Sequence, residues 1–116
     1  MKNKDRIILQ KIIGYINDVT EYIDELSFEQ FMTDKKTISA CAFTVSQIGE
    51  LANNLSLHTQ EKHSDIPWKS IRGLRNRIVH DYENINFLVL WGTITKSLPE
   101  LLNQINKVLD SKVDKD

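Results

Sequence analysis

The chain has 116 residues, of which 41 % are hydrophobic and 27 % are charged, and this composition indicates one globular domain. Fifteen basic residues face sixteen acidic ones, so the net charge of −1 argues against a protein that coats nucleic acid by bulk charge. Four glycines, two prolines and one cysteine exclude collagen-like, disordered and disulfide-stapled chains, and the single thiol favours a reducing, cytoplasmic setting. The sequence predicts neither a secretory signal peptide nor a membrane-spanning segment.

Apolar residues recur at spacings of three and four along most of the chain, which predicts helices nearly throughout. A first helix is expected over about residues 3–26. Ser27 and Gln30 have the spacing of a capping box, which opens a short helical turn. Thr33 and Asp34 can cap a second long helix over about residues 35–57, and the polar stretch over about residues 56–66 is expected to be a loop.

A third helix is expected to begin at Pro67, placed in its first turn, and to run to about residue 80. A fourth helix follows over about residues 85–109, with an apolar stripe that starts at Leu88, and Pro99 inside it should kink or split the helix. The sequence thus predicts an all-α fold, an up-down bundle of four main helices. We expect a single domain over residues 1–110 and a frayed charged tail over residues 111–116.

The charge is distributed unevenly along the sequence. Residues 66–80 contain no acid and four basic residues, whereas the remainder holds eleven basic against sixteen acidic residues, so the segment carries +4 and the remainder −5. Such a run is most often a solvated helix face. On an ideal continuous helix, however, Arg75 falls within the apolar arc, where a charge needs a partner or a water-filled opening.

The same helical projection separates the polar residues of this segment. Arg72, Asn76 and His80 form a stripe at intervals of four residues, and Arg75 lies about 140° around the axis from His80. Arg75 and His80 therefore cannot converge from one straight helix. Either the helix unwinds at His80, or a two-fold dimer brings the side chains of two copies into one cleft.

The run Arg75-Asn76-Arg77-Ile78-Val79-His80-Asp81-Tyr82 fits the pattern R-x-x-x-x-H-x-Y. With the preceding Ile66-Pro67-Trp68 and with Gln47-Ile48-Gly49-Glu50-Leu51 upstream, it resembles the HepT-like branch of the HEPN superfamily, over essentially the whole chain. The resemblance implies an HEPN-like bundle and a metal-independent endoribonuclease, the homodimeric toxin of a type VII-like toxin–antitoxin system. It also implies two partners: the RNA substrate, and a minimal nucleotidyltransferase antitoxin (MntA-like) that transfers AMP to the motif tyrosine, Tyr82.

The residue types suit this chemistry. His80 can transfer protons near neutral pH, Arg75 can bind phosphate oxygens, and Asn76 can contact the substrate or hold His80. An AMP group on Tyr82 would place a bulky anion beside these cations and compete with RNA. Three further cations are candidates for binding the RNA backbone: Lys69, Arg72 and Arg77.

Structural interpretations stand beside these roles. Arg75 alone would usually be an ion-pair partner, for example of Glu50, and His80 would usually interact with a helix end. His58 and His63 lack metal-ligand spacing, so we expect no metal site and no cofactor, and Cys41 is expected in the core. The alternative function is a non-catalytic helical subunit that presents Tyr82 or the basic cleft to a nucleotidyltransferase, or that binds a nucleotide.

Overall fold

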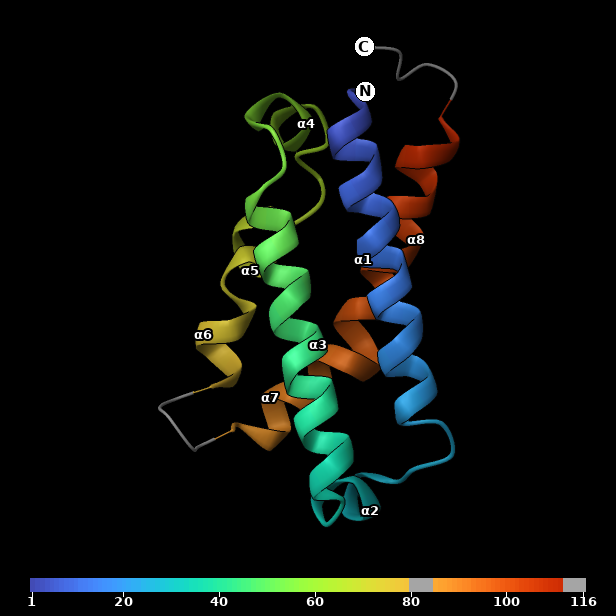
Figure 1. Cartoon of the computed structure of the whole chain (residues 1–116), viewed down its shortest axis with the longest axis vertical. Coiled ribbons are helices and arrows are strands. Elements are labelled where there is room, and N and C mark those ends of the chain that lie inside the picture. The colour runs from blue at the N-terminus through green and yellow to red at the C-terminus, as the bar shows by residue number, and fades with distance from the viewer. Residues whose placement is uncertain (80–84, 112–116) are drawn as a thin grey trace.

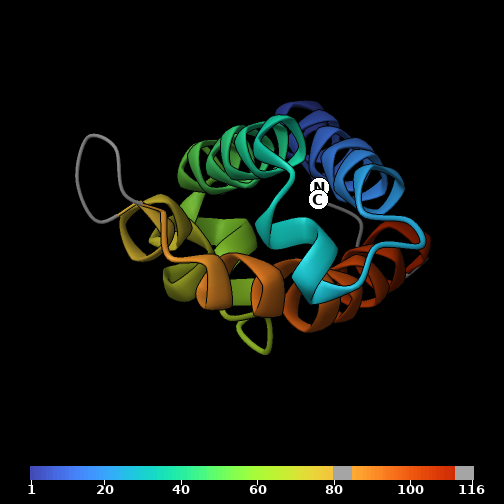
Figure 2. The ribbon, with the colours of Figure 1, turned by 90° about the horizontal axis from the view of Figure 1, so that it is seen from below.

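The computed structural model describes residues 1–79 and 85–111, and these form an all-α bundle of 46 × 29 × 20 Å (Figure 1). The α1 and α3 helices run antiparallel along each other and make one layer, and the helices of the second half of the chain cover the other side (Figure 2). In chain order the elements are α1 (Asn3–Tyr22), α2 (Phe28–Met32), α3 (Lys35–Asn53), α4 (Leu57–Lys62), α5 (Trp68–Arg72), α6 (Leu74–Ile78), α7 (Phe87–Gly92), the π-helical η1 (Thr93–Ser97) and α8 (Leu98–Asp110).

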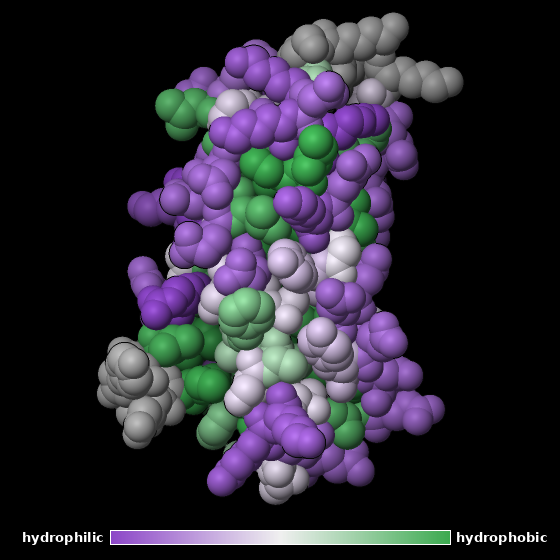
Figure 3. Space-filling model, viewed as in Figure 1, coloured by the Kyte–Doolittle hydropathy of each residue, from purple (hydrophilic) through white to green (hydrophobic). Residues whose placement is uncertain are grey.

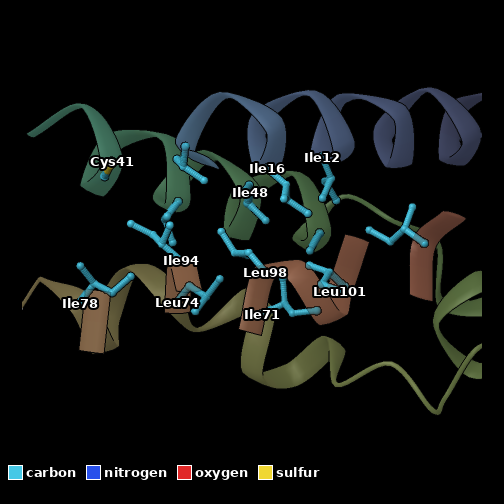
Figure 4. Close-up of a cluster of buried hydrophobic side chains, with 14 of the residues drawn as sticks. Ile12, Ile16, Cys41, Ile48, Ile71, Leu74, Ile78, Ile94, Leu98 and Leu101 are labelled. Carbon is cyan, nitrogen blue, oxygen red and sulfur yellow. The ribbon is translucent and has the colours of Figure 1, made fainter. Parts of the chain in front are cut away.

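The core lies between these two layers (Figure 4). Ile12 and Ile16 from α1 and Ile48 from α3 point towards Leu98 and Leu101 from α8, and all five are at most 3 % exposed. Full burial of an aliphatic side chain of this size contributes about 1.5–3 kcal/mol. The bundle therefore depends mainly on apolar contact between α1–α3 and the second half of the chain.

The first half of the chain follows the sequence prediction closely. Ser27 and Gln30 form the predicted capping box, with Gln30 N donating to Ser27 Oγ over 3.1 Å and Ser27 N donating to Gln30 Oε1 over 2.9 Å. Asp34 caps α3 by accepting from Thr37 N. The predicted first helix is too long, because α1 ends at Tyr22 and the turn after it places Glu25 at φ 65°, in the left-handed region.

The predicted loop over residues 56–66 is wrong, because α4 occupies its first part. Ser56 caps α4 by accepting from Thr59 N, and the carboxylate of Asp5 holds both residues from α1. Asp5 is 1 % exposed and accepts from Ser56 N (3.1 Å), Ser56 Oγ (2.5 Å) and Thr59 Oγ1 (2.6 Å). Burial alone would raise the pKa of Asp5, but these hydrogen bonds outweigh it and leave the pKa lowered.

The predicted third helix is two short helices. Gly73 interrupts it between α5 and α6, and Pro67 is the N-cap of α5 rather than a residue of its first turn. The second helix ends at Ile78, since Val79 is extended (φ −103°, ψ 104°) and forms an isolated antiparallel bridge with Ile85. The helix therefore ends before His80, which lies outside the described residues, and the dimer that the sequence left as the other alternative stays a prediction.

The fourth helix is split, as Pro99 predicts. The chain passes through the π-helical turn η1 immediately before α8, whose first turn contains Pro99. A π turn holds more residues than an α turn, so it changes the phase of the apolar stripe on its two sides. This is why Leu88, predicted to start the stripe, is 72 % exposed, whereas Leu90 is buried.

The start of α1 and the end of α8 lie at the same end of the bundle, where Arg6 Nη2 donates to Leu109 O over 3.4 Å (Figure 1). The predicted frayed tail, beyond Ser111, lies outside the described residues. Among the described helices, none is long and apolar enough to cross a membrane.

Candidate functional site

The basic motif begins on α6, which buries its apolar side and exposes its polar side. Leu74 and Ile78 are at most 2 % exposed, whereas Arg75, Asn76 and Arg77 are all exposed. The prediction that Arg75 lies on the core face is therefore wrong. It assumed one continuous helix through residue 73, and the break at Gly73 changes the phase between α5 and α6.

Arg75 lines an open groove between α3 and α6, which we call the α3–α6 groove. Its volume is about 440 Å³ and its lining comprises Ala42, Phe43, Ser46, Gln47, Glu50, Arg75 and Val79. Glu50 and Arg75 share the groove, but no hydrogen bond or ion pair joins their side chains to each other or to any residue in the described ranges 1–79 and 85–111. The Arg75–Glu50 pair considered from the sequence is thus not formed, and the guanidinium can take an anionic ligand.

Gly49 determines how closely the α5 backbone approaches α3. A Cβ at this position would lie 3.1 Å from Ile71 O, which is tighter than an ordinary side-chain contact, and 3.6 Å from Arg72 O. A larger residue at this position would require the α5 backbone to shift by a few tenths of an ångström. Residues next to Gly49 on α3 line the α3–α6 groove, so the backbone contact helps to fix the position of that wall.

The other three cations lie away from Arg75. Arg77 Nη2 donates to Ser70 O over 3.3 Å, and Arg77 and Lys69 line a second groove of about 420 Å³ together with Pro67, Ser70 and Gly73. Arg72 donates to Gln60 Oε1, and Gln60 Nε2 in turn donates to Leu55 O over 2.9 Å. The structure therefore separates the candidate RNA-binding residues Lys69, Arg72 and Arg77 from the groove that contains Arg75.

His80 and Tyr82, predicted for proton transfer and for modification, lie outside the described residues. Asn76 is described and exposed, and its side chain makes no hydrogen bond within residues 1–79 and 85–111. The roles of these three residues stay predictions.

The other residues considered in the sequence analysis lie outside the α3–α6 groove, and two of them, Cys41 and Trp68, are buried. Cys41 is fully buried, and burial, with a contribution from nearby Asp34, raises the pKa of its thiol to about 11. Trp68 is buried and its Nε1 donates to His63 O over 3.0 Å. His58 is exposed on α4, and no group of three or more His, Cys, Asp or Glu among the described residues can hold a metal ion.

Sequence reasoning missed the aromatic residue of the groove. Phe43 is 64 % exposed and is not among the buried residues of α3. Its position outside the apolar stripe of this helix could have been seen in the sequence, and would have indicated an exposed ring. The face that carries α3 and α6 shows apolar side chains over the middle of α3 and beside the lower end of α6 (Figure 3). An exposed aromatic ring beside an arginine that has no partner in the described part of the chain is typical of a binding surface rather than of a core.

The all-α bundle, and the R-x-x-x-x-H-x-Y motif whose first residues lie on α6, are those of the HEPN-like class of proteins. The family model described as "Ribonuclease HepT-like" matches residues 12–108, and the chain belongs to this family, which makes it a ribonuclease by class.

Two relatives cover almost the whole chain. A protein of Caldanaerobacter subterraneus subsp. tengcongensis, named "Putative RNase TTE0752", is 35 % identical over 107 residues, which is 92 % of this chain and 96 % of the relative. A protein of Thermococcus cleftensis, named "Probable ribonuclease HepT", is 31 % identical over 108 residues, 93 % and 98 % of the two chains. No solved structure matches the chain significantly.

Proposed function

We propose that this chain is a metal-independent endoribonuclease, the toxin of a type VII-like toxin–antitoxin system. The main observation in support is the exposed guanidinium of Arg75, which lines the open α3–α6 groove and has no partner among the described residues. Arg75 precedes His80 by five positions in the sequence. Membership of a ribonuclease family supports RNA as the substrate.

The proposed reaction is an internal transesterification of RNA. The 2′-oxygen of one nucleotide forms a bond to the adjacent phosphorus, and the bond from phosphorus to the 5′-oxygen of the next nucleotide breaks. One proton leaves the 2′-hydroxyl and one is added to the departing oxygen, and the products are a 2′,3′-cyclic phosphate and a 5′-hydroxyl. His80 provides the proton transfer, and Arg75 offsets the negative charge that grows on the phosphate oxygens. Asn76 contacts the substrate or orients His80.

A second copy of the chain completes the proposed site. Two-fold symmetry would place two copies each of Arg75, Asn76 and His80 around one cleft. It would also bring together the two segments over residues 66–80, each with four basic side chains, of which Lys69, Arg72 and Arg77 lie outside the α3–α6 groove of their own chain. The acidic remainder of the surface would disfavour RNA elsewhere, so the net charge of −1 is compatible with a localised RNA site.

The proposed regulator is a minimal nucleotidyltransferase antitoxin (MntA-like). The phenolic oxygen of Tyr82 would attack the α-phosphorus of ATP, release pyrophosphate and retain AMP. The added phosphodiester carries a negative charge and bulk two residues from His80, where it would compete with RNA. Incubation with the partner and ATP should add one or more AMP masses to the wild type and none to Tyr82→Phe. An equal mass gain on both proteins contradicts Tyr82 as the acceptor.

The main test is cleavage of single-stranded RNA in EDTA. Wild type should cut, and His80→Ala should lose cutting while its circular dichroism spectrum stays helical. His58→Ala is the matched control, because His58 is exposed on α4, and it should cut as wild type does. Full cutting by a folded His80→Ala protein contradicts the proposal. AMP transfer to a wild-type chain that never cuts RNA would favour the non-catalytic subunit instead.

A further inference from the structure

We propose that the α3–α6 groove is a nucleobase subsite, which holds one unstacked base of single-stranded RNA next to the phosphate bound by Arg75 and prefers a base with an exocyclic amino group. The inference rests on the proposed function, since it assigns the part of the substrate adjoining the phosphate.

The α3 wall of the groove carries one continuous stripe of ligand-type side chains. Phe43, Ser46, Gln47 and Glu50 are spaced at i, i+3, i+4 and i+7, so they lie on one face of α3, over about 10 Å of helix. This stripe is separate from the buried residues of the helix, such as Val45 and Ile48. It is therefore a second, solvent-facing stripe that the fold itself does not use.

Phe43 provides a surface for stacking. Its side chain is 64 % exposed, and its ring makes no aromatic contact with the described residues. Proteins recognise single-stranded RNA by splaying bases out and stacking them on aromatic side chains. Phe43 is placed for this role because it shares the groove with Arg75, which would bind the phosphate of the same nucleotide.

The polar residues of the stripe are available to a base edge. Ser46 Oγ donates to Ala42 O over 2.8 Å and keeps its oxygen as an acceptor. The amide of Gln47, which is half-buried, and the carboxylate of Glu50 make no hydrogen bond within the described ranges. The Gln47 amide can both donate and accept, so it can bind the edge of a base.

The groove carries a negative charge on its α3 wall, from Glu50, and a positive charge on its α6 wall, from Arg75. These two residues line the same groove without pairing, so each remains available to a different part of one nucleotide. The guanidinium binds the phosphate, and the carboxylate binds hydrogen-bond donors on the base. The groove volume of about 440 Å³ lies within the usual range for small-ligand sites.

This arrangement predicts a base preference. A carboxylate accepts from the amino groups of cytosine, adenine and guanine. The one donor on the pairing edge of uracil, N3–H, lies between two carbonyl oxygens that a carboxylate repels, so uracil binds a carboxylate less well. Gln47 can donate or accept and does not reverse this preference. Cuts should therefore adjoin amino-bearing bases about ten times more often than uracil.

The first arm of the experiment maps cut sites on a single-stranded RNA of mixed sequence. Glu50→Gln should still cut and should reduce the preference over uracil at least several-fold, because an amide can donate to uracil carbonyls. Phe43→Ala should lower kcat/KM about tenfold for all bases. The matched controls are Glu29→Gln on α2 and Tyr22→Ala at the end of α1, both exposed and outside the groove, and they should keep the wild-type profile.

The second arm measures binding without cutting. The probes are 2′-O-methyl pentanucleotides, which lack the attacking hydroxyl, and their affinity is followed by fluorescence anisotropy. Wild type should bind the cytosine probe more tightly than the uracil probe, and Glu50→Gln should reduce the difference. If wild type shows this preference but cuts no RNA, the nucleobase subsite stands and the proposed function fails.

The opposite outcomes overturn the subsite alone. Wild type that cuts with a flat base profile, or a profile that Glu50→Gln leaves unchanged, contradicts the subsite and leaves the ribonuclease proposal intact. Dissociation of a dimer by Phe43→Ala in sedimentation, with an unchanged base profile, would instead assign the α3–α6 groove to contact between two copies of the chain.

Discussion

Replacement of Asp5 by alanine should strongly destabilise the fold, although Asp5 lies far in sequence from the residues it binds. Its carboxylate is 1 % exposed and accepts three hydrogen bonds, from Ser56 N, Ser56 Oγ and Thr59 Oγ1. Asp5→Ala removes the acceptor for all three donors and detaches the start of α4 from α1.

The magnitude follows from the number and kind of these bonds. A hydrogen bond to a charged group contributes about 1.5–3 kcal/mol, but such values do not add. The hydroxyls of Ser56 and Thr59 lie 3.2 Å apart and can partly satisfy each other, whereas the backbone N–H of Ser56 loses its acceptor. We expect Asp5→Ala to lower the free energy of unfolding by about 3 kcal/mol, and Asp5→Asn, which keeps one acceptor oxygen, by about 2 kcal/mol.

The assay is urea unfolding followed by circular dichroism at pH 7 and at descending pH. The pKa of Asp5 is lowered from its ordinary 3.8, so the folded protein favours the ionised carboxylate. This stabilisation is fully present above about pH 4 and is lost as the pH falls through the lowered folded-state pKa. The difference between wild type and Asp5→Ala should therefore shrink in that acidic window.

The matched control is Asp18→Ala, which removes an exposed carboxylate from the same helix and should change stability by at most about 0.5 kcal/mol. An Asp5→Ala protein as stable as Asp18→Ala at pH 7 would refute the assigned hydrogen-bonded role. A pH-independent difference between wild type and Asp5→Ala would refute the ionic part of the argument.

Three further predictions concern single positions. Gly49→Val should destabilise the fold by about 2 kcal/mol in urea unfolding, because the added Cβ would lie 3.1 Å from Ile71 O. Gly14→Ala should stabilise the fold by up to about 1 kcal/mol, because nothing lies within 4 Å of an added Cβ there. Equal effects of the two substitutions would contradict the close approach at Gly49. Glu25→Gly should raise stability by about 0.5–1 kcal/mol by relieving the left-handed backbone, and a loss of stability would count against that strain. Iodoacetamide should alkylate Cys41 about a hundredfold more slowly in the native protein at pH 8 than in urea, since the thiol is buried and its pKa is about 11; similar rates would show that it is accessible.

The elements that depend on local signals were predictable from the sequence. The capping box at Ser27, the cap at Asp34 and the split before Pro99 each depend on residues a few positions apart, and all three are confirmed. The stripe of α3 was also found, because a 3.6-residue period persists over a long uninterrupted helix.

The errors lie where distant residues or a break in the helix decide the structure. The α4 helix is joined through Ser56 to Asp5, 51 positions away, which no local pattern contains. The break at Gly73 displaced the projected position of Arg75, and the π turn displaced that of Leu88. For the candidate site, the motif identified Arg75, Asn76 and His80 as candidate functional residues, but it did not identify their neighbours in space. That Arg75 shares a groove with the α3 stripe is visible only in the tertiary structure, because α3 and α6 are distant in sequence.

The contact at Gly49 has a consequence for how this scaffold can diversify. Because a Cβ at Gly49 would lie 3.1 Å from Ile71 O, the approach of α3 to the α5 backbone depends on the missing side chain at this one position. Exposed positions on the same helix, such as Phe43, Gln47 and Glu50, can therefore change their chemistry over generations without loosening the bundle. A helix spacing held at one glycine, with exchangeable side chains around the groove, would let chains of this architecture acquire different targets.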